Sequence, residues 1–157
     1  MSWADDDHTN EQRIQLEITT YLGDRQTFVE GDKLSFLVTL NQDAYLLVLY
    51  ETAEHQLLQL LPHKYSTVRK YSAGYYIPVP DDTARYQFII APPFGSERIL
   101  AFASDREFPL LQGKDLANGL RLLSDSTAQV VQQLRDNTEN QERDYGEARM
   151  ELTTRAH

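Results

Sequence analysis

One basic and aromatic segment stands out in this 157-residue chain, between positions 64 and 76. Its candidate binding residues, which Lys64 precedes, are Tyr65, Arg69, Lys70, Tyr71, Tyr75 and Tyr76. Aromatic rings with a polar tip bury a large area at a small cost in rotamer entropy, and cations stack on their faces. The segment therefore predicts a surface that recognises a protein or a sugar. In an alternative interpretation, some of these tyrosines fill the faces of an edge strand.

Residue patterns that would support catalysis or metal binding are missing from the sequence. Only His55 and His63 among the four histidines fall on predicted ordered elements; their spacing fits no helical zinc signature, and we interpret both as exposed turn residues. No serine lies in a Gly-x-Ser-x-Gly elbow, and neither glycine-rich phosphate-binding pattern occurs. Asp81 and Asp82 lie in a predicted turn, where carboxylates are usually solvated. We therefore expect no enzymatic activity, no catalytic residue, no metal site and no cofactor.

The composition narrows the classes of partner. The formal net charge is −9 and no run of lysine and arginine interrupts it, so nucleic acid is not an expected partner. The longest apolar runs are far shorter than the roughly 20 residues of a membrane-spanning helix, so we expect no membrane insertion. The absence of cysteine excludes disulfides and thiolate zinc sites.

The first residues of the chain are compared with a secretory signal, because such a signal would indicate the cellular compartment of the protein. Residues 1–12 are interpreted as a polar, flexible leader, because they lack the basic start and apolar middle of a secretory signal. Two compartments stay open. The protein is extracytoplasmic (periplasmic) if the chain is a fragment of an exported protein, and cytoplasmic otherwise.

Short strands account for most of the chain. Apolar and polar residues alternate from Arg13 to Thr20 and from Lys33 to Leu40, the period of strands with one buried face. The apolar run from Ala44 to Tyr50 predicts a central strand covered on both faces, with a hairpin partner at Gln56 to Leu61. Further strands are predicted at Tyr75 to Val79, Arg85 to Ala91 and Glu97 to Ala103. The predicted core residues are Leu34, Phe36, Val38, Leu47, Leu49, Phe88 and Ile90.

A helical signal precedes the end of the chain. Leu116, Leu120, Leu123, Val130 and Leu134 recur near a period of 3.6, and Ser126 with Gln129 forms a capping box. We expect two short helices or one broken helix within about residues 115–136, a loop from Asn137 to Asp144, and a last strand around Ala148 to Thr153. Because a terminal strand must pair, the helical segment should cross over and return the chain to the sheet.

These patterns predict the fold class. It is mainly β, an antiparallel β-sandwich of immunoglobulin-like type with a short C-terminal helical crossover and a final strand. Residues 13–155 are expected to form one domain.

A series of short motifs carries a family resemblance. In order they are Phe28-Val29-Glu30-Gly31-Asp32-Lys33-Leu34-Ser35-Phe36, Asp43-Ala44-Tyr45-Leu46, Leu60-Leu61-Pro62, Ala73-Gly74, Ile77-Pro78 and Pro93-Phe94-Gly95-Ser96-Glu97. From Leu16 to Phe108 the chain resembles the bacterial family called domain of unknown function 4384. The resemblance implies a β-sandwich-like module, often appended to larger bacterial proteins such as kinases, proteases, repeat proteins and surface or envelope components. It implies no catalytic residues.

Three functions follow as hypotheses. The first is a non-catalytic interaction or accessory module, part of or partner to a larger bacterial protein or an envelope or secretion-associated assembly. Its expected partner is a protein, with an envelope polymer as a further candidate; the sequence does not specify the oligomeric state. The second is a carbohydrate- or small-ligand-binding domain that uses the segment from Tyr65 to Tyr76. The third is an inhibitor or immunity-type protein that binds a basic partner.

Overall fold

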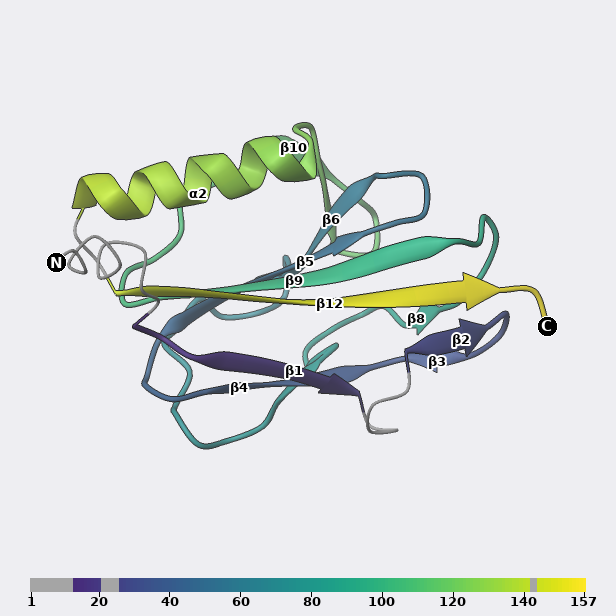
Figure 1. The fold of residues 1–157 in the computed structure, drawn as a ribbon, viewed down its shortest axis with the longest axis horizontal. Helices are drawn as coiled ribbons and strands as arrows, with labels where there is room; N and C mark the ends of the chain where they lie inside the picture. Colours follow the sequence, from purple (N-terminus) through teal and green to yellow (C-terminus); the bar gives the residue numbers. More distant parts are fainter. Residues whose placement is uncertain (1–12, 21–25, 142–143) are drawn as a thin grey trace, which may run out of the picture.

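The computed structural model describes residues 13–20, 26–141 and 144–157 of the chain (Figure 1). The predicted leader at residues 1–12 lies outside this part. Within it, the fold is mainly β, as the sequence predicts, and it contains one α-helix, α2 Thr127–Gln141.

A seven-stranded sheet forms the centre of the molecule. Its strands in spatial order are β10 Gly113–Asp115, β11 Arg121–Leu123, β6 Leu57–Leu61, β5 Tyr45–Glu51, β9 Ser96–Ser104, β12 Tyr145–Arg155 and β2 Thr27–Val29. Neighbouring strands are antiparallel, except that β2 runs parallel to β12. As predicted, the apolar run ending at Tyr50 forms a central strand, and β6 is its hairpin partner.

The remaining strands form two smaller sheets. The first contains β1 Leu16–Thr20, β4 Phe36–Leu40 and β7 Ile77–Val79; the second contains β3 Lys33–Leu34 and β8 Phe88–Ile89. Figure 1 shows β1 and β4 on one side of the large sheet and α2 on the other side. The large sheet is therefore covered on both faces, which explains the nearly continuous apolar sequence of β5.

Two hydrophobic cores lie on the two faces of this sheet. Between the sheets, Leu46, Val48 and Tyr50 of β5 join a cluster with Phe36 and Val38 of β4. Beneath α2, Leu47 and Leu49 of β5 join a cluster with Val130 and Leu134. Alternate residues of one strand thus contribute to different cores. Of the seven predicted core residues, six are buried, and Phe88 is half-buried against the inter-sheet cluster.

The predicted crossover is present, but the prediction of a helix in its first part is wrong. The segment from Gly113 to Leu123 forms a β-hairpin, where a helix was expected, because Leu120 belongs to the inter-sheet core and Leu123 to the core beneath α2. One helical face would have directed both leucines into the same core. Helix α2 then connects β11 to β12, which have the same direction and are separated by three strands.

The helix begins where the capping box predicts. The backbone N–H of Gln129 donates to Ser126 Oγ at 3.2 Å, and the backbone N–H of Ser126 donates to Gln129 Oε1 at 2.8 Å. The prediction of a loop from Asn137 to Asp144 is wrong for residues 137–141, because α2 continues to Gln141. Its last turns are polar, and a helix end needs no apolar periodicity where it does not cover a core.

The strand predicted from Lys33 to Leu40 is divided at Ser35. Its first part, β3, pairs with β8, whereas β4 pairs with β1 and β7. Strand β2, with only Phe28 fully buried, was not predicted. The immunoglobulin-like arrangement of the strands and the single-domain boundaries stay predictions.

Candidate functional site

The segment that carries the predicted binding residues connects the two main sheets. It leaves β6 of the seven-stranded sheet at Leu61 and enters β7 of the three-stranded sheet at Ile77. Midway, Tyr71 forms an isolated antiparallel bridge with Ala44 through two backbone hydrogen bonds of 2.7 and 3.1 Å. The connection is therefore held against the start of β5 at its centre.

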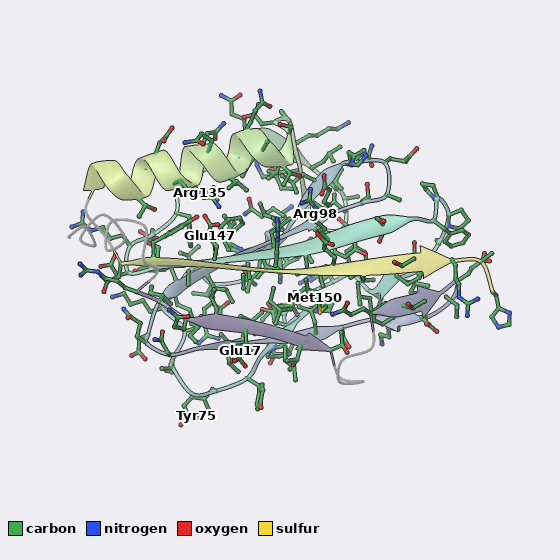
Figure 2. The ribbon with its side chains drawn as sticks, in the orientation of Figure 1. Glu17, Tyr75, Arg98, Arg135, Glu147 and Met150 are labelled. Atoms are coloured by element: carbon green, nitrogen blue, oxygen red, sulfur yellow. The ribbon has the colours of Figure 1, made fainter. Side chains whose placement is uncertain are left out.

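The four tyrosines have different environments. Tyr71 is 8 % exposed and belongs to the inter-sheet core, and Tyr65 is half-buried, whereas Tyr75 and Tyr76 are 71 % and 67 % exposed. Figure 2 shows Tyr75 at the margin of the molecule opposite α2. The structure thus divides the predicted set into packing residues and solvent-facing residues.

The half-buried ring of Tyr65 lies close to Gly119, which is in the turn between β10 and β11. A side chain at Gly119, which has a φ of +94°, would meet that ring at 2.9 Å. The neighbouring backbone is fixed as well, because the N–H of Lys64 donates to the carbonyl oxygen of Gly119 at 3.0 Å. Tyr65 therefore joins this connection to the β10–β11 hairpin.

Cations stack on three of the aromatic rings in this region. The guanidinium carbon of Arg69 lies 4.4 Å from the ring centroid of Tyr71, and that of Arg85 lies 4.1 Å from the centroid of Tyr65. Lys70 Nζ lies 5.9 Å from the ring centroid of Tyr45. Burial raises the pKa of Tyr71, and the nearby Arg69 opposes that rise. Both Arg69 and Lys70 are exposed, so their charges face solvent as well as the rings.

A groove lies beside this connection. Its volume is about 200 Å³, and its lining residues are Tyr45, Leu46, Leu47, Gln59, Pro62, Thr67, Val68, Arg69, Tyr71, Glu107, Phe108, Pro109, Leu110 and Leu111. Most of these residues belong to two segments, 67–71 and 107–111, which we call the two walls; the others are Pro62 and residues of β5 and β6. Val68 and Leu110, on different walls, are 55 % and 83 % exposed. We call this site the 68/110 groove.

Only part of the predicted site reaches the 68/110 groove. Arg69 and Tyr71 line it, while Tyr65, Lys70, Tyr75 and Tyr76 do not. The second wall was not predicted. The available signal was the run Phe108-Pro109-Leu110-Leu111, which is apolar but lies between β9 and β10 without strand alternation.

The interpretation of His63 as an exposed turn residue is wrong. Its side chain is 1 % exposed, and Nε2 lies 2.8 Å from Asp81 Oδ1. The backbone N–H of Tyr65 donates to Nδ1 at 3.1 Å, so in the neutral ring Nε2 carries the proton and donates to Asp81. His55 is exposed, as predicted, with 82 % of its side chain accessible.

The geometry around His63 suits a structural tie. In a catalytic triad, one ring nitrogen faces the acid and the other faces the nucleophile. Here Nδ1 is occupied by a backbone N–H, while the Thr83 hydroxyl, 3.4 Å from Nε2, donates to the same Asp81 at 2.9 Å. The cluster therefore joins residues 63–65 to residues 81–83.

Across residues 13–20, 26–141 and 144–157, no group of three or more His, Asp or Glu side chains could hold a metal ion. No helix in the same ranges is long and apolar enough to cross a membrane.

A protein-family model matches part of the chain. The family model described as Domain of unknown function (DUF4384) matches residues 27–107, just over half of the chain. The match runs from β2 past β9 and ends at Glu107, at the start of the second wall of the groove. No curated protein matches the chain. No solved structure matches it.

Proposed function

The chain belongs to the DUF4384 family, and we propose that it is a non-catalytic binding module that recognises an extended segment of a partner protein in the 68/110 groove. The module acts as part of, or partner to, a larger bacterial protein or an envelope or secretion-associated assembly. Any catalytic activity would come from the other domains or proteins of that assembly.

One observation carries this proposal. Val68 and Leu110 are large apolar side chains that face solvent from two different walls of one concave site. Isolated exposed apolar residues are common, but exposed apolar residues that border a groove are typical of interaction sites. Half-buried Phe108 and buried Leu111 add an apolar lining that a bound side chain would contact.

The charges define the chemistry of the partner. The charged residues that line the groove are Arg69 on one wall and Glu107 on the other, and Lys70, which follows Arg69, lies outside the lining. Acidic residues of a partner would therefore lie on the side of Arg69 and away from Glu107. A segment with an apolar anchor and flanking acidic residues would bury the anchor between Val68 and Leu110. Its carboxylates would face the two cations, which steer the encounter.

The non-catalytic part of the proposal rests on the arrangement of His63, which is buried. His63, Asp81 and Thr83 resemble a triad in composition, but Nδ1 of the ring accepts a backbone N–H and the hydroxyl donates to the acid. The ring of His63 is therefore not arranged as the base that would activate Thr83. Turnover that disappears in a Thr83→Ala variant would contradict this part of the proposal.

The carbohydrate-binding alternative has one observation in its favour. Tyr75 and Tyr76 expose most of their side chains, and such rings can stack on a sugar. Neither ring lines the groove, so this function would use a different surface. The two functions are therefore separable by mutation.

A random-peptide display selection tests the proposal. We expect the wild-type protein to enrich peptides with an apolar residue flanked by Asp or Glu, and a Leu110→Ser variant to lose that enrichment. Ile89→Ser is the matched control, because Ile89 is 52 % exposed in β8 and does not line the groove. Equal enrichment by the wild type and the Leu110→Ser variant would reject the groove as the binding site.

A further inference from the structure

A second concave site lies on the side of the large sheet that α2 covers. Its volume is about 640 Å³, and it is lined by Arg98, Leu100, Phe102, Thr127, Ala128, Val131, Gln132, Arg135, Glu147, Ala148 and Arg149. Figure 2 shows Arg135 and Glu147 between α2 and β12, with Arg98 farther along β9. We call this site the arginine cleft. It shares no lining residue with the 68/110 groove.

Two of its arginines are held in place by carboxylates. Arg135 donates from Nε and Nη2 to the two carboxylate oxygens of Glu147, at 2.9 and 2.7 Å. Arg98 donates from Nε to Glu51 Oε1 at 2.6 Å, and its Nη2 lies 2.5 Å from the same oxygen. Each guanidinium uses one edge in this way, so the N–H groups of Nη1 stay available for another acceptor. The ion pairs thus orient the donors before a ligand arrives.

The third arginine supplies the excess charge. Arg149 is exposed, and no described carboxylate lies within ion-pair distance of it. On β12 it is two residues from Glu147, and it pairs in register with Leu100, so it points to the same face of the sheet as Arg98. Among the residues that line the cleft, three arginines therefore meet one carboxylate, Glu147. Glu51, which pairs with Arg98, and Glu151, opposite Arg98 in the register, do not line the cleft.

The floor of the cleft is apolar. Leu100 and Phe102 project from β9, and Val131 of α2 packs against the same cluster. The volume falls within the range of roughly 300–1,000 Å³ that is usual for sites binding small molecules. Its walls are one helix and two strands, which fix side chains more firmly than loops do.

We propose that the arginine cleft binds a small organic anion, a carboxylate carried on an apolar body. The carboxylate lies among Arg98, Arg135 and Arg149, and the apolar body lies against Leu100, Phe102 and Val131. This site is independent of the 68/110 groove and of the partner segment proposed for it.

The test uses 4-phenylbutyrate as the probe and backbone amide NMR shifts as the readout. Two controls are its neutral amide, 4-phenylbutyramide, and acetate, which has no apolar body. We expect saturable shifts at the amides of Arg98, Leu100, Val131 and Arg149 with the acid only. No saturable shift at these amides at about 10 mM acid, a concentration above even millimolar dissociation constants, would overturn the proposal. Equal binding of the neutral amide would also overturn it.

Variants of two arginines on one strand complete the test. Arg149→Gln should weaken 4-phenylbutyrate binding about tenfold, the usual effect of losing one charged hydrogen bond. Arg155→Gln is the matched control, because Arg155 is exposed on β12 outside the cleft. If both variants weaken 4-phenylbutyrate binding equally, the net charge of the protein explains the effect, and the proposal is overturned. If a glutamate-rich peptide shifts the cleft amides and 4-phenylbutyrate does not, the small-anion proposal is wrong and the ligand of the cleft is a protein segment.

Discussion

Leu110 and Leu111 are adjacent leucines with opposite environments: Leu110 is 83 % exposed, and Leu111 is 3 % exposed. Leu111 belongs to the core beneath α2, whereas Leu110 lies on a wall of the 68/110 groove. One residue therefore attaches the wall to the fold while its neighbour faces solvent. An exposed leucine on a firmly attached wall is what a docking surface for an apolar side chain requires.

This relationship predicts opposite effects of two alanine substitutions. Leu111→Ala should lower the free energy of unfolding by about 2–5 kcal/mol, because it leaves a cavity in the core. Leu110→Ala should change it by no more than about 0.5 kcal/mol, as surface substitutions usually do. Urea denaturation measures both. A large loss of stability in Leu110→Ala would mean that this side chain packs against the protein.

The tyrosines should separate in the same way. Tyr71→Ala should cost about 3–5 kcal/mol, because Tyr71 is buried in the inter-sheet core, while Tyr75→Ala should be nearly neutral. Because Tyr71 is buried, a double variant with Tyr71→Ala and Tyr75→Ala should show a clear decrease in melting temperature, which thermal unfolding monitored by circular dichroism would detect.

The capping box should stabilise α2 measurably. Ser126→Ala removes the hydroxyl that accepts the N–H of Gln129, and it should lower the free energy of unfolding by about 1 kcal/mol. Ser124→Ala is the control, because the Ser124 hydroxyl makes no hydrogen bond with a described residue. If both variants unfold at the same denaturant concentration as the wild type, the cap contributes nothing to stability.

Glu147 should make stability depend on pH. Burial acts to raise the pKa of Glu147, but hydrogen bonds from Arg135 and Tyr145 outweigh burial and hold this pKa below its ordinary value of 4.5. A lowered pKa in the folded state means that the stabilisation is present above pH 4.5 and is lost as the pH falls through the folded pKa.

A glutamine variant measures this contribution. At pH 7, Glu147→Gln should be less stable than the wild type by about 1 kcal/mol, a value reduced because Arg135 is half-exposed. The difference should shrink as the pH falls below 4.5. A difference that stays constant from pH 7 to pH 3, in the range where carboxylates titrate, would show that the charge of Glu147 is not its source.

The sequence predicted the strands that obey local rules. Alternation predicted β1 and β4, and the apolar run before Glu51 predicted the central β5. The β10–β11 hairpin was missed because Leu116, Leu120 and Leu123 have helical spacing, and only the tertiary structure shows that they contribute to two cores. Strand β2 has three residues and depends on a parallel pairing with the distant β12, which leaves no local signal.

The candidate site was predicted on one side only. The aromatic and basic residues from Tyr65 to Tyr76 drew attention to the wall that contains Arg69 and Tyr71. The opposite wall at Leu110 lies far along the chain, and the folding of β9 brings it near. The arginine cleft was missed for the same reason, since Arg98, Arg135 and Arg149 lie on three elements that are distant in sequence.

Amide NMR mapping of a peptide enriched in the display selection tests the central proposal most directly. The peptide is titrated into labelled protein, and the perturbed amides identify its binding site. We predict the largest saturable shifts at Val68, Arg69, Leu110 and Leu111, with loss of binding in Leu110→Ser and unchanged affinity in Ile89→Ser. Shifts centred on Tyr75 and Tyr76, with the 68/110 groove unperturbed, would contradict the account.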